Sequence, residues 1–205
     1  MNRYDHELHR YFIDDEQVLS VTQILNKTGL SRDYSFLNDI NLQDANSRGI
    51  SIHRHCELYE NDELSKYETD PKSMVCVEQW KELRQKIIKK HGEPNEICVE
   101  KNLYSIKKRF AGTSDIYFLY RTIRPFFVVV DWKTGVDSQA GELQLCGYSD
   151  LIAENIDFKP CHIYRYIAYL WYDKPNGKLK QCNDQMDFVY WNSAYNICQY
   201  LKNRG

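Results

Sequence analysis

The spacing of apolar residues along the chain changes character near residue 92. Upstream, helical spacing and cap signals predict three helical regions, at Val18–Leu30, Phe36–Leu64 and Pro71–Lys90. Ser20 or Thr22 is the expected cap of the first helix, and Gly29 is its stop. The second region is expected to be interrupted near Arg48 and Gly49.

Downstream, β-branched and aromatic runs predict three strands joined by short turns, at Ile97–Ile106, Phe110–Tyr120 and Phe126–Lys133. A helix, a long strand, a hairpin turn and a closing helix are expected next, at Glu142–Glu154, Cys161–Tyr172, Pro175–Gly177 and Tyr190–Lys202. This order predicts a mixed α/β (α+β) fold, with a central mixed sheet flanked by helices and an N-terminal helical layer. With 205 residues, 42% of them apolar, we expect a single domain. Its residues 1–92 are expected to be mainly helical, and residues 93–205 to form the core.

Composition narrows the function classes. The net charge of −2 means that a polyanionic partner must meet a local basic patch or a bound metal. Lys107, Lys108 and Arg109 form one such patch, although most charge runs are solvated faces. Seven cysteines without a Cys-x-x-Cys pair predict reduced thiols and no zinc or iron–sulfur site. The charged start and the lack of a long apolar run predict a soluble, cytoplasmic protein, in the host cytoplasm if the source is viral.

Candidate chemistry lies at the end of the apolar run from residue 126. Asp131 and Lys133 are two residues apart, so they share one face of a strand end. If the preceding hairpin turns about residue 123, Asp115 lies directly opposite Asp131, with side chains about 5 Å apart. Two carboxylates that close repel each other unless a proton or a metal lies between them, and oxygen ligands suit Mg²⁺ or Mn²⁺. A divalent metal bridged by the two aspartates, with Lys133 beside it, is therefore predicted.

The tripeptide Asp-x-Lys carries little weight alone, because it also occurs at Asp70-Pro71-Lys72 and at Asp157-Phe158-Lys159. Neither of those copies ends an apolar strand that faces a second acid. The apolar strand before it and the acid opposite it therefore distinguish the tripeptide at Asp131 from the other two.

Several motifs stand in an order that resembles one nuclease family. They are Arg48-Gly49-Ile50-Ser51-Ile52-His53, Gly112-Thr113-Ser114-Asp115, Asp131-Trp132-Lys133-Thr134-Gly135, and Gln144 followed by Tyr148. Over residues 48–152 the chain resembles the RecB-like branch of the PD-(D/E)XK nuclease superfamily, and Ser20-Val21-Thr22-Gln23-Ile24-Leu25 resembles the opening helix of its phage-type exonucleases. Ser114 replaces the proline for which the superfamily is named. The resemblance implies a restriction-endonuclease-like core.

The resemblance also implies metal ligands. Asp115 and Asp131 would bind the metal, with further ligands from His53 and from the backbone carbonyl of Trp132. Glu100 resembles the upstream acid that holds a second metal or its water. The plainer alternatives are a hydrogen-bonded histidine and an exposed strand carboxylate.

By the same resemblance, Lys133 would orient the attacking water and stabilise charge on the phosphate. Gln144 and Tyr148 lie on one helix face and would contact the DNA backbone or support Lys133. Solvent exposure and ordinary packing are the alternatives for these two.

The predicted function is a Mg²⁺- or Mn²⁺-dependent DNA exonuclease whose products carry 5′-phosphates. A structure-selective or defence-related endonuclease of the same fold, and a non-catalytic DNA-binding protein on a nuclease scaffold, are the alternatives. No phosphate-binding loop occurs in the sequence, so no nucleotide cofactor is expected and any helicase would be a separate chain. A helicase, a single-strand-binding protein or a recombinase are candidate partners; no membrane partner is expected.

Overall fold

The computed structural model describes residues 1–31, 39–135, 139–202 and 204. Its strands are β1 (Arg3–Asp5), β2 (Arg10–Ile13), β3 (Glu16–Ser20), β4 (Glu96–Ser105), β5 (Phe110–Tyr120), β6 (Phe126–Lys133), β7 (His162–Tyr169) and β8 (Lys178–Cys182). Its helices are α1 (Val21–Lys27), α2 (Asp39–Glu60), the short 3-10 helix η1 (Leu64–Lys66), α3 (Pro71–His91), α4 (Gln139–Asn155) and α5 (Met186–Lys202). None of the described helices is long and apolar enough to cross a membrane.

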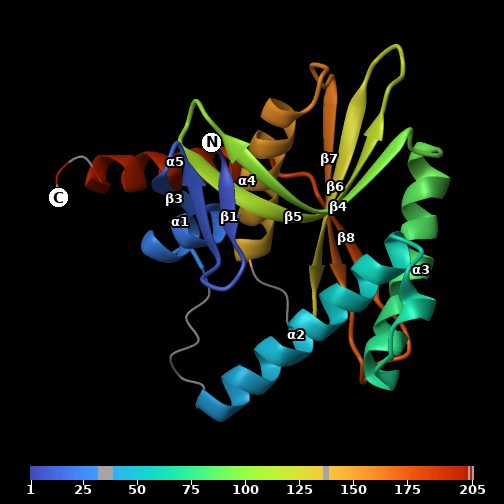
Figure 1. Cartoon of the computed structure of the whole chain (residues 1–205). Helices are drawn as coiled ribbons and strands as arrows, with labels where there is room; N and C mark the ends of the chain where they lie inside the picture. Colours follow the sequence, from blue (N-terminus) through green and yellow to red (C-terminus); the bar gives the residue numbers. More distant parts are fainter. Residues whose placement is uncertain (32–38, 136–138, 203, 205) are drawn as a thin grey trace.

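The strands form one mixed sheet in the order β1-β2-β3-β5-β6-β7-β8, with β4 also paired to β5 (Figure 1). The β3–β5 and β6–β7 pairs are parallel, and the others are antiparallel. Apolar side chains of α1, α4 and α5 pack on one face of the central strands, and those of α2 and α3 pack on the other. The predicted mixed α/β fold with a central sheet flanked by helices is confirmed, and it is consistent with a restriction-endonuclease-like core.

The first twenty residues differ from the prediction. They form three strands, and the first helix begins at Val21 rather than at Val18, because Val18 is a buried member of β3 that pairs with β2. Ser20 caps this helix in a reciprocal capping box with Gln23. Asp14 has a φ of 50° and Asp15 a φ of 63°, as the mirror-image turn of a two-residue hairpin requires.

The helical region after it also differs, because α2 runs through Arg48 and Gly49 without the predicted interruption. A glycine inside a helix costs about 1 kcal/mol, which a long packed helix absorbs. The predicted start of this region at Phe36 lies outside the described residues. The three central strands match their predicted bounds within one residue, whereas β7 ends three residues before the predicted Tyr172.

Strand β5 contains a fork that positions the motif at residues 112–115. One edge of β5 pairs with β4 along almost its whole length. The other edge pairs with β3 at Phe110 and Ala111 and with β6 from Ile116 onward. Among the strand pairs that the structure describes, none covers the segment from Gly112 to Asp115 on this edge. The motif therefore lies where β3 and β6 diverge.

Candidate active site

The two predicted aspartates lie at the open end of the β5–β6 pair. Its register runs from Tyr120 opposite Phe126 to Ile116 opposite Val130, as a hairpin centred on residue 123 requires. One position further along, the backbone N–H of Trp132 donates to the Asp115 carboxylate over 2.7 Å. Asp115 and Asp131 are 8% and 2% exposed. The Asp115 side chain thus takes the place of the next backbone partner, which fixes it against the Asp-Trp-Lys segment.

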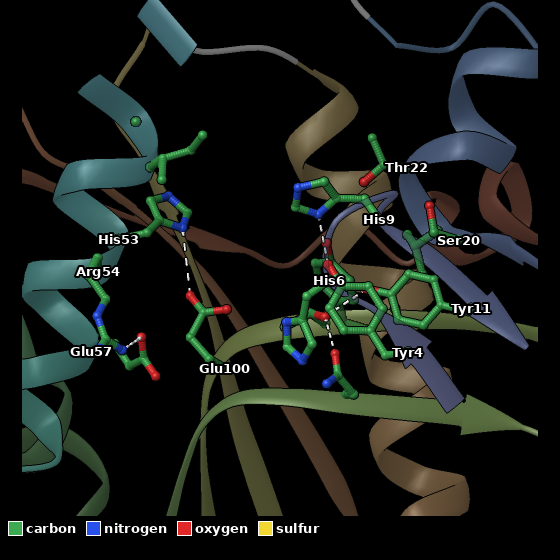
Figure 2. A pocket seen from close by; sticks show the side chains of 17 residues that line it. Tyr4, His6, His9, Tyr11, Ser20, Thr22, His53, Arg54, Glu57 and Glu100 are labelled. Atoms are coloured by element: carbon green, nitrogen blue, oxygen red, sulfur yellow. Dashed lines mark hydrogen bonds and ion pairs between the residues drawn. The ribbon is translucent and has the colours of Figure 1, made fainter. Parts of the chain in front are cut away.

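Three side chains from three elements converge into a candidate metal site. His53 of α2, Glu100 of β4 and Asp115 of β5 each offer a ligand atom, and these atoms lie within 4.8 Å of one another. The Nδ1 atom of His53 is 3.5 Å from Asp115 Oδ1 and 3.8 Å from Glu100 Oε1, the latter contact being drawn in Figure 2. One imidazole nitrogen and two carboxylates are a donor set that suits a divalent cation, Mn²⁺ among them.

The ring of His53 is held in a defined orientation. Its Nε2–H donates to the backbone carbonyl of Trp132 over 2.9 Å, and the two rings meet edge to face at 5.7 Å. A metal-binding histidine commonly donates its second ring N–H to such a carbonyl, because this fixes the tautomer. Nδ1 is then the atom that faces the carboxylates. The predicted role of the Trp132 carbonyl as a metal ligand stays a prediction, since here this oxygen accepts from His53.

Glu100 occupies a strained backbone position. Its φ of 46° lies in the left-handed region, which costs a non-glycine residue on the order of 1 kcal/mol. Burial and the neighbouring Asp115 also raise the pKa of Glu100 to about 8. Backbone strain and an unfavourable electrostatic environment therefore coincide at the Glu100 carboxylate. Such a combination is typical of functional positions rather than of an exposed strand residue.

The acids at the site outnumber its cationic side chains. Burial raises the pKa of Asp131 to about 6, against the lowering effect of Lys133 and with a further increase from Asp115. Burial opposes charge on Asp115 too, but His53 and Lys133 outweigh it and hold the pKa of Asp115 below its usual value. Burial would lower the pKa of His53, yet Asp115 and Glu100 raise it to about 9. Three acids thus surround two cationic side chains, and the raised pKa values of Glu100 and Asp131 mean that a proton, or a cation in its place, relieves the repulsion between the carboxylates.

Lys133 is placed by Asp131 and by Gln144. Its Nζ is 2.7 Å from Asp131 Oδ2 and donates to Gln144 Oε1 over 2.9 Å. Gln144 in turn donates to Thr22 Oγ1 over 2.8 Å and to the Tyr148 hydroxyl over 3.3 Å. The resemblance implies that Gln144 contacts the DNA backbone or supports Lys133. The hydrogen bond from Lys133 to Gln144 corresponds to the second role.

Tyr148 packs against the fork in β5. It is 6% exposed, and its ring lies so near Gly112 that a Cβ at that position would be 3.1 Å from Tyr148 Cε1. The same Cβ would be 3.3 Å from side-chain atoms of Val21 and Leu151. The glycine of the Gly-Thr-Ser-Asp motif therefore permits the close approach of α4 and α1 to β5.

The basic segment Lys107–Arg109 lies in the turn between β4 and β5. Lys108 pairs with Asp150 over 2.8 Å, and Arg109 pairs with Glu16 over 2.6 Å. None of the three residues lines the pocket described next. Their role as DNA contacts stays a prediction.

A pocket of about 670 Å³ opens beside His53 and Glu100. Its lining includes four residues of the β1–β2 hairpin that are not among the predicted site residues, namely Tyr4, His6, His9 and Tyr11 (Figure 2). No motif marks these residues. The sequence signal here is the aromatic and β-branched run Tyr11-Phe12-Ile13, followed by the acidic pair Asp14-Asp15.

Comparison with known proteins does not assign the chain to a family. No family model matches it. A stretch of 92 residues is 29% identical to the uncharacterized protein R161 of Acanthamoeba polyphaga mimivirus and covers 45% of this chain, but only 20% of that protein's length. A crystal structure of a provisionally assigned exonuclease from Eubacterium rectale is similar with a TM-score of 0.48 and 8% identity, covering 87% of this chain and 71% of the other. The crystal structure of SSO0001 has a TM-score of 0.36 and 10% identity, over 92% of this chain and 79% of the other.

Proposed function

We propose that this chain is a nuclease, and more specifically a Mg²⁺- or Mn²⁺-dependent DNA exonuclease. The observation that supports the proposal most directly is the convergence of His53, Glu100 and Asp115 within 4.8 Å, beside the ion pair of Lys133 and Asp131. Acids, an imidazole and a lysine in one partly buried cluster are suited to phosphodiester hydrolysis.

The donor set fits a divalent metal. His53 Nδ1 and the carboxylates of Glu100 and Asp115 would hold it, with Asp131 as the neighbouring acid. When bound, such a cation supplies Lewis-acid activation of water and neutralises charge on the phosphate. It would also balance the buried acids and let a chain of net charge −2 accept a polyanion.

The remaining chemistry falls to Lys133. Its ammonium group lies at the surface of the cluster, partly exposed, between Asp131 and Gln144. From there it would orient the attacking water and stabilise negative charge on the phosphate oxygens. Gln144 would keep the lysine in this place, and the product would carry a 5′-phosphate.

The test is a digest of end-labelled single-stranded and double-stranded DNA with Mg²⁺, Mn²⁺ or EDTA. We expect metal-dependent release of mononucleotides or short fragments from linear DNA, and none from covalently closed circles. Cleavage of the closed circle would replace the exonuclease with an endonuclease. DNA binding without any cleavage would favour a non-catalytic scaffold.

A matched pair of variants ties the activity to the site. Lys133→Ala is expected to abolish cleavage, whereas Lys159→Ala, in the exposed Asp-Phe-Lys copy, is expected to leave it unchanged. Circular dichroism and thermal unfolding serve as fold controls. Wild-type activity in a folded Lys133→Ala protein would overturn the proposed site.

A further inference from the structure

The wall of the pocket opposite the acids is built from aromatic and imidazole side chains. Tyr4, His6, His9 and Tyr11 come from the β1–β2 hairpin, and in Figure 2 they lie across the pocket from His53, Arg54 and Glu57, with Glu100 between the two groups. We call these four hairpin residues the hairpin wall. None of them has a role in the proposed hydrolysis.

The hairpin wall is a preorganised surface. The rings of Tyr4 and Tyr11 are 4.6 Å apart and inclined by 30°, and His6 meets Tyr4 edge to face at 4.6 Å. The Tyr4 hydroxyl is 2.7 Å from His9 Nδ1. Tyr4 is only partly buried and the two histidines are exposed, so their rings remain available to a ligand.

The wall is also tied to the candidate active site. The Tyr11 hydroxyl is 2.6 Å from Thr113 Oγ1, and Thr113 donates to Asn102 Oδ1 over 2.6 Å. Thr113 lies two positions before Asp115 on the same strand, and Asn102 two positions after Glu100. The strands that carry the acids therefore also fix the position of the aromatic rings.

Partly exposed aromatic rings beside a polar pocket are suited to stacking nucleobases, a contact that does not depend on sequence. A volume of about 670 Å³ lies in the usual range for small-molecule pockets and accommodates a single nucleotide. A base inside a duplex is stacked on both sides and cannot offer its face to such a wall. An unpaired base can.

We propose that the hairpin wall binds the base of an unpaired nucleotide of the substrate strand, while the phosphate of that nucleotide faces Glu100 and His53. The inference rests on the proposed function, because it assigns the substrate of the same site. It makes single-stranded DNA ends, or duplex ends with frayed or overhanging strands, the preferred substrate class.

The test measures binding without cleavage. Short single-stranded DNA with 2-aminopurine at the 5′ end, the 3′ end or an internal position is titrated in Mg²⁺ with protein that carries Lys133→Ala and is not expected to cleave, and its fluorescence is followed. We expect quenching at one end when the base stacks. Tyr4→Ala should weaken binding of the single strand about tenfold or more, and the exposed His6→Ala, which cannot disturb the core, should weaken it by about threefold. Tyr190→Ala, an exposed tyrosine on α5, is the matched control and should change nothing.

The outcomes separate this inference from the proposed function. Metal-dependent cleavage together with unchanged single-strand affinity in both hairpin variants would overturn the stacking role and leave the nuclease intact. End-specific quenching that both variants lose would support the stacking role even in a protein that shows no cleavage. If the two variants lose as much affinity for blunt duplex as for single-stranded DNA, the preference for unpaired ends is overturned.

Discussion

The contact between Gln144 and Lys133 yields the sharpest prediction about the candidate site. Gln144→Met keeps the length of the side chain and removes the acceptor of the Lys133 ammonium together with the donors to Thr22 and Tyr148. A hydrogen bond to a charged group contributes about 1.5–3 kcal/mol. If the lysine needs this bond in the transition state, the variant should lose about 10- to 150-fold in kcat.

The division between kcat and KM decides which of two roles Gln144 has. A residue that positions Lys133 affects the chemical step, so kcat should fall while KM for DNA stays within about twofold. A residue that contacts the DNA backbone affects binding, so KM should rise while kcat is kept. The assay is steady-state and single-turnover cleavage of end-labelled DNA with saturating metal.

A double-mutant cycle checks that the effect passes through the observed bonds. Thr22→Val removes the hydroxyl that accepts from Gln144 and keeps the branched shape. It should reduce kcat by about 2- to 10-fold in the wild type, as expected for a neutral hydrogen bond, and have no effect when Gln144 is already methionine. Full additivity of the two substitutions, or an unchanged kcat in Gln144→Met, would refute the positioning role.

Three further predictions concern packing, the hairpin and the metal. Gly112→Ala should lower the free energy of unfolding in urea by about 1–3 kcal/mol, because its Cβ would be 3.1 Å from Tyr148, whereas Gly135→Ala, with open space around it, should not. Asp15→Gly should raise the free energy of unfolding by up to about 1 kcal/mol, since it relieves a φ of 63° in the β2–β3 turn; a loss of stability would contradict that account. Mn²⁺ at about 100 times its Kd should stabilise the folded chain by about 2.7 kcal/mol in thermal unfolding, and an equal shift in Asp115→Asn would argue against the proposed ligand set.

Local geometry made part of the site predictable. The strand bounds and the turn about residue 123 follow from alternation and turn chemistry, and they place Asp115 and Asp131 one position beyond the last pair of the β5–β6 register. The position of His53, which contacts Glu100 and Asp115, could not be predicted in this way, because His53 lies on a helix that is distant in sequence. Only the resemblance connected it to the strands, and no rule of spacing would have done so.

The first three strands escaped prediction for a physical reason. β1 and β3 are short, and their sequences are polar at most positions, so they carry little alternation of their own. Val18 and Leu19 also lie directly before a helix. Their apolar side chains fit the spacing of that helix, so the prediction counted them as its first residues. The hairpin wall of the pocket was missed with these strands, since its residues belong to a part of the chain expected to be helical.

A break in the regularity of the sheet creates the site. Cys98 and Leu103 of β4 lie in the same hydrophobic core, although they are an odd number of residues apart and strict alternation would place them on opposite faces. Between them, Glu100 adopts a left-handed φ of 46°, while the register with β5 continues unchanged on both sides. On β5 the same level is the fork, where no strand of the described residues pairs with the other edge of Gly112 to Asp115. If β4 were regular at Glu100, or if another strand paired with β5 at Asp115, the two carboxylates would point into the core or be covered by the neighbouring strand. The distortion at Glu100 and the fork at Asp115 therefore act together, and they leave two carboxylates on adjacent strands free to meet His53.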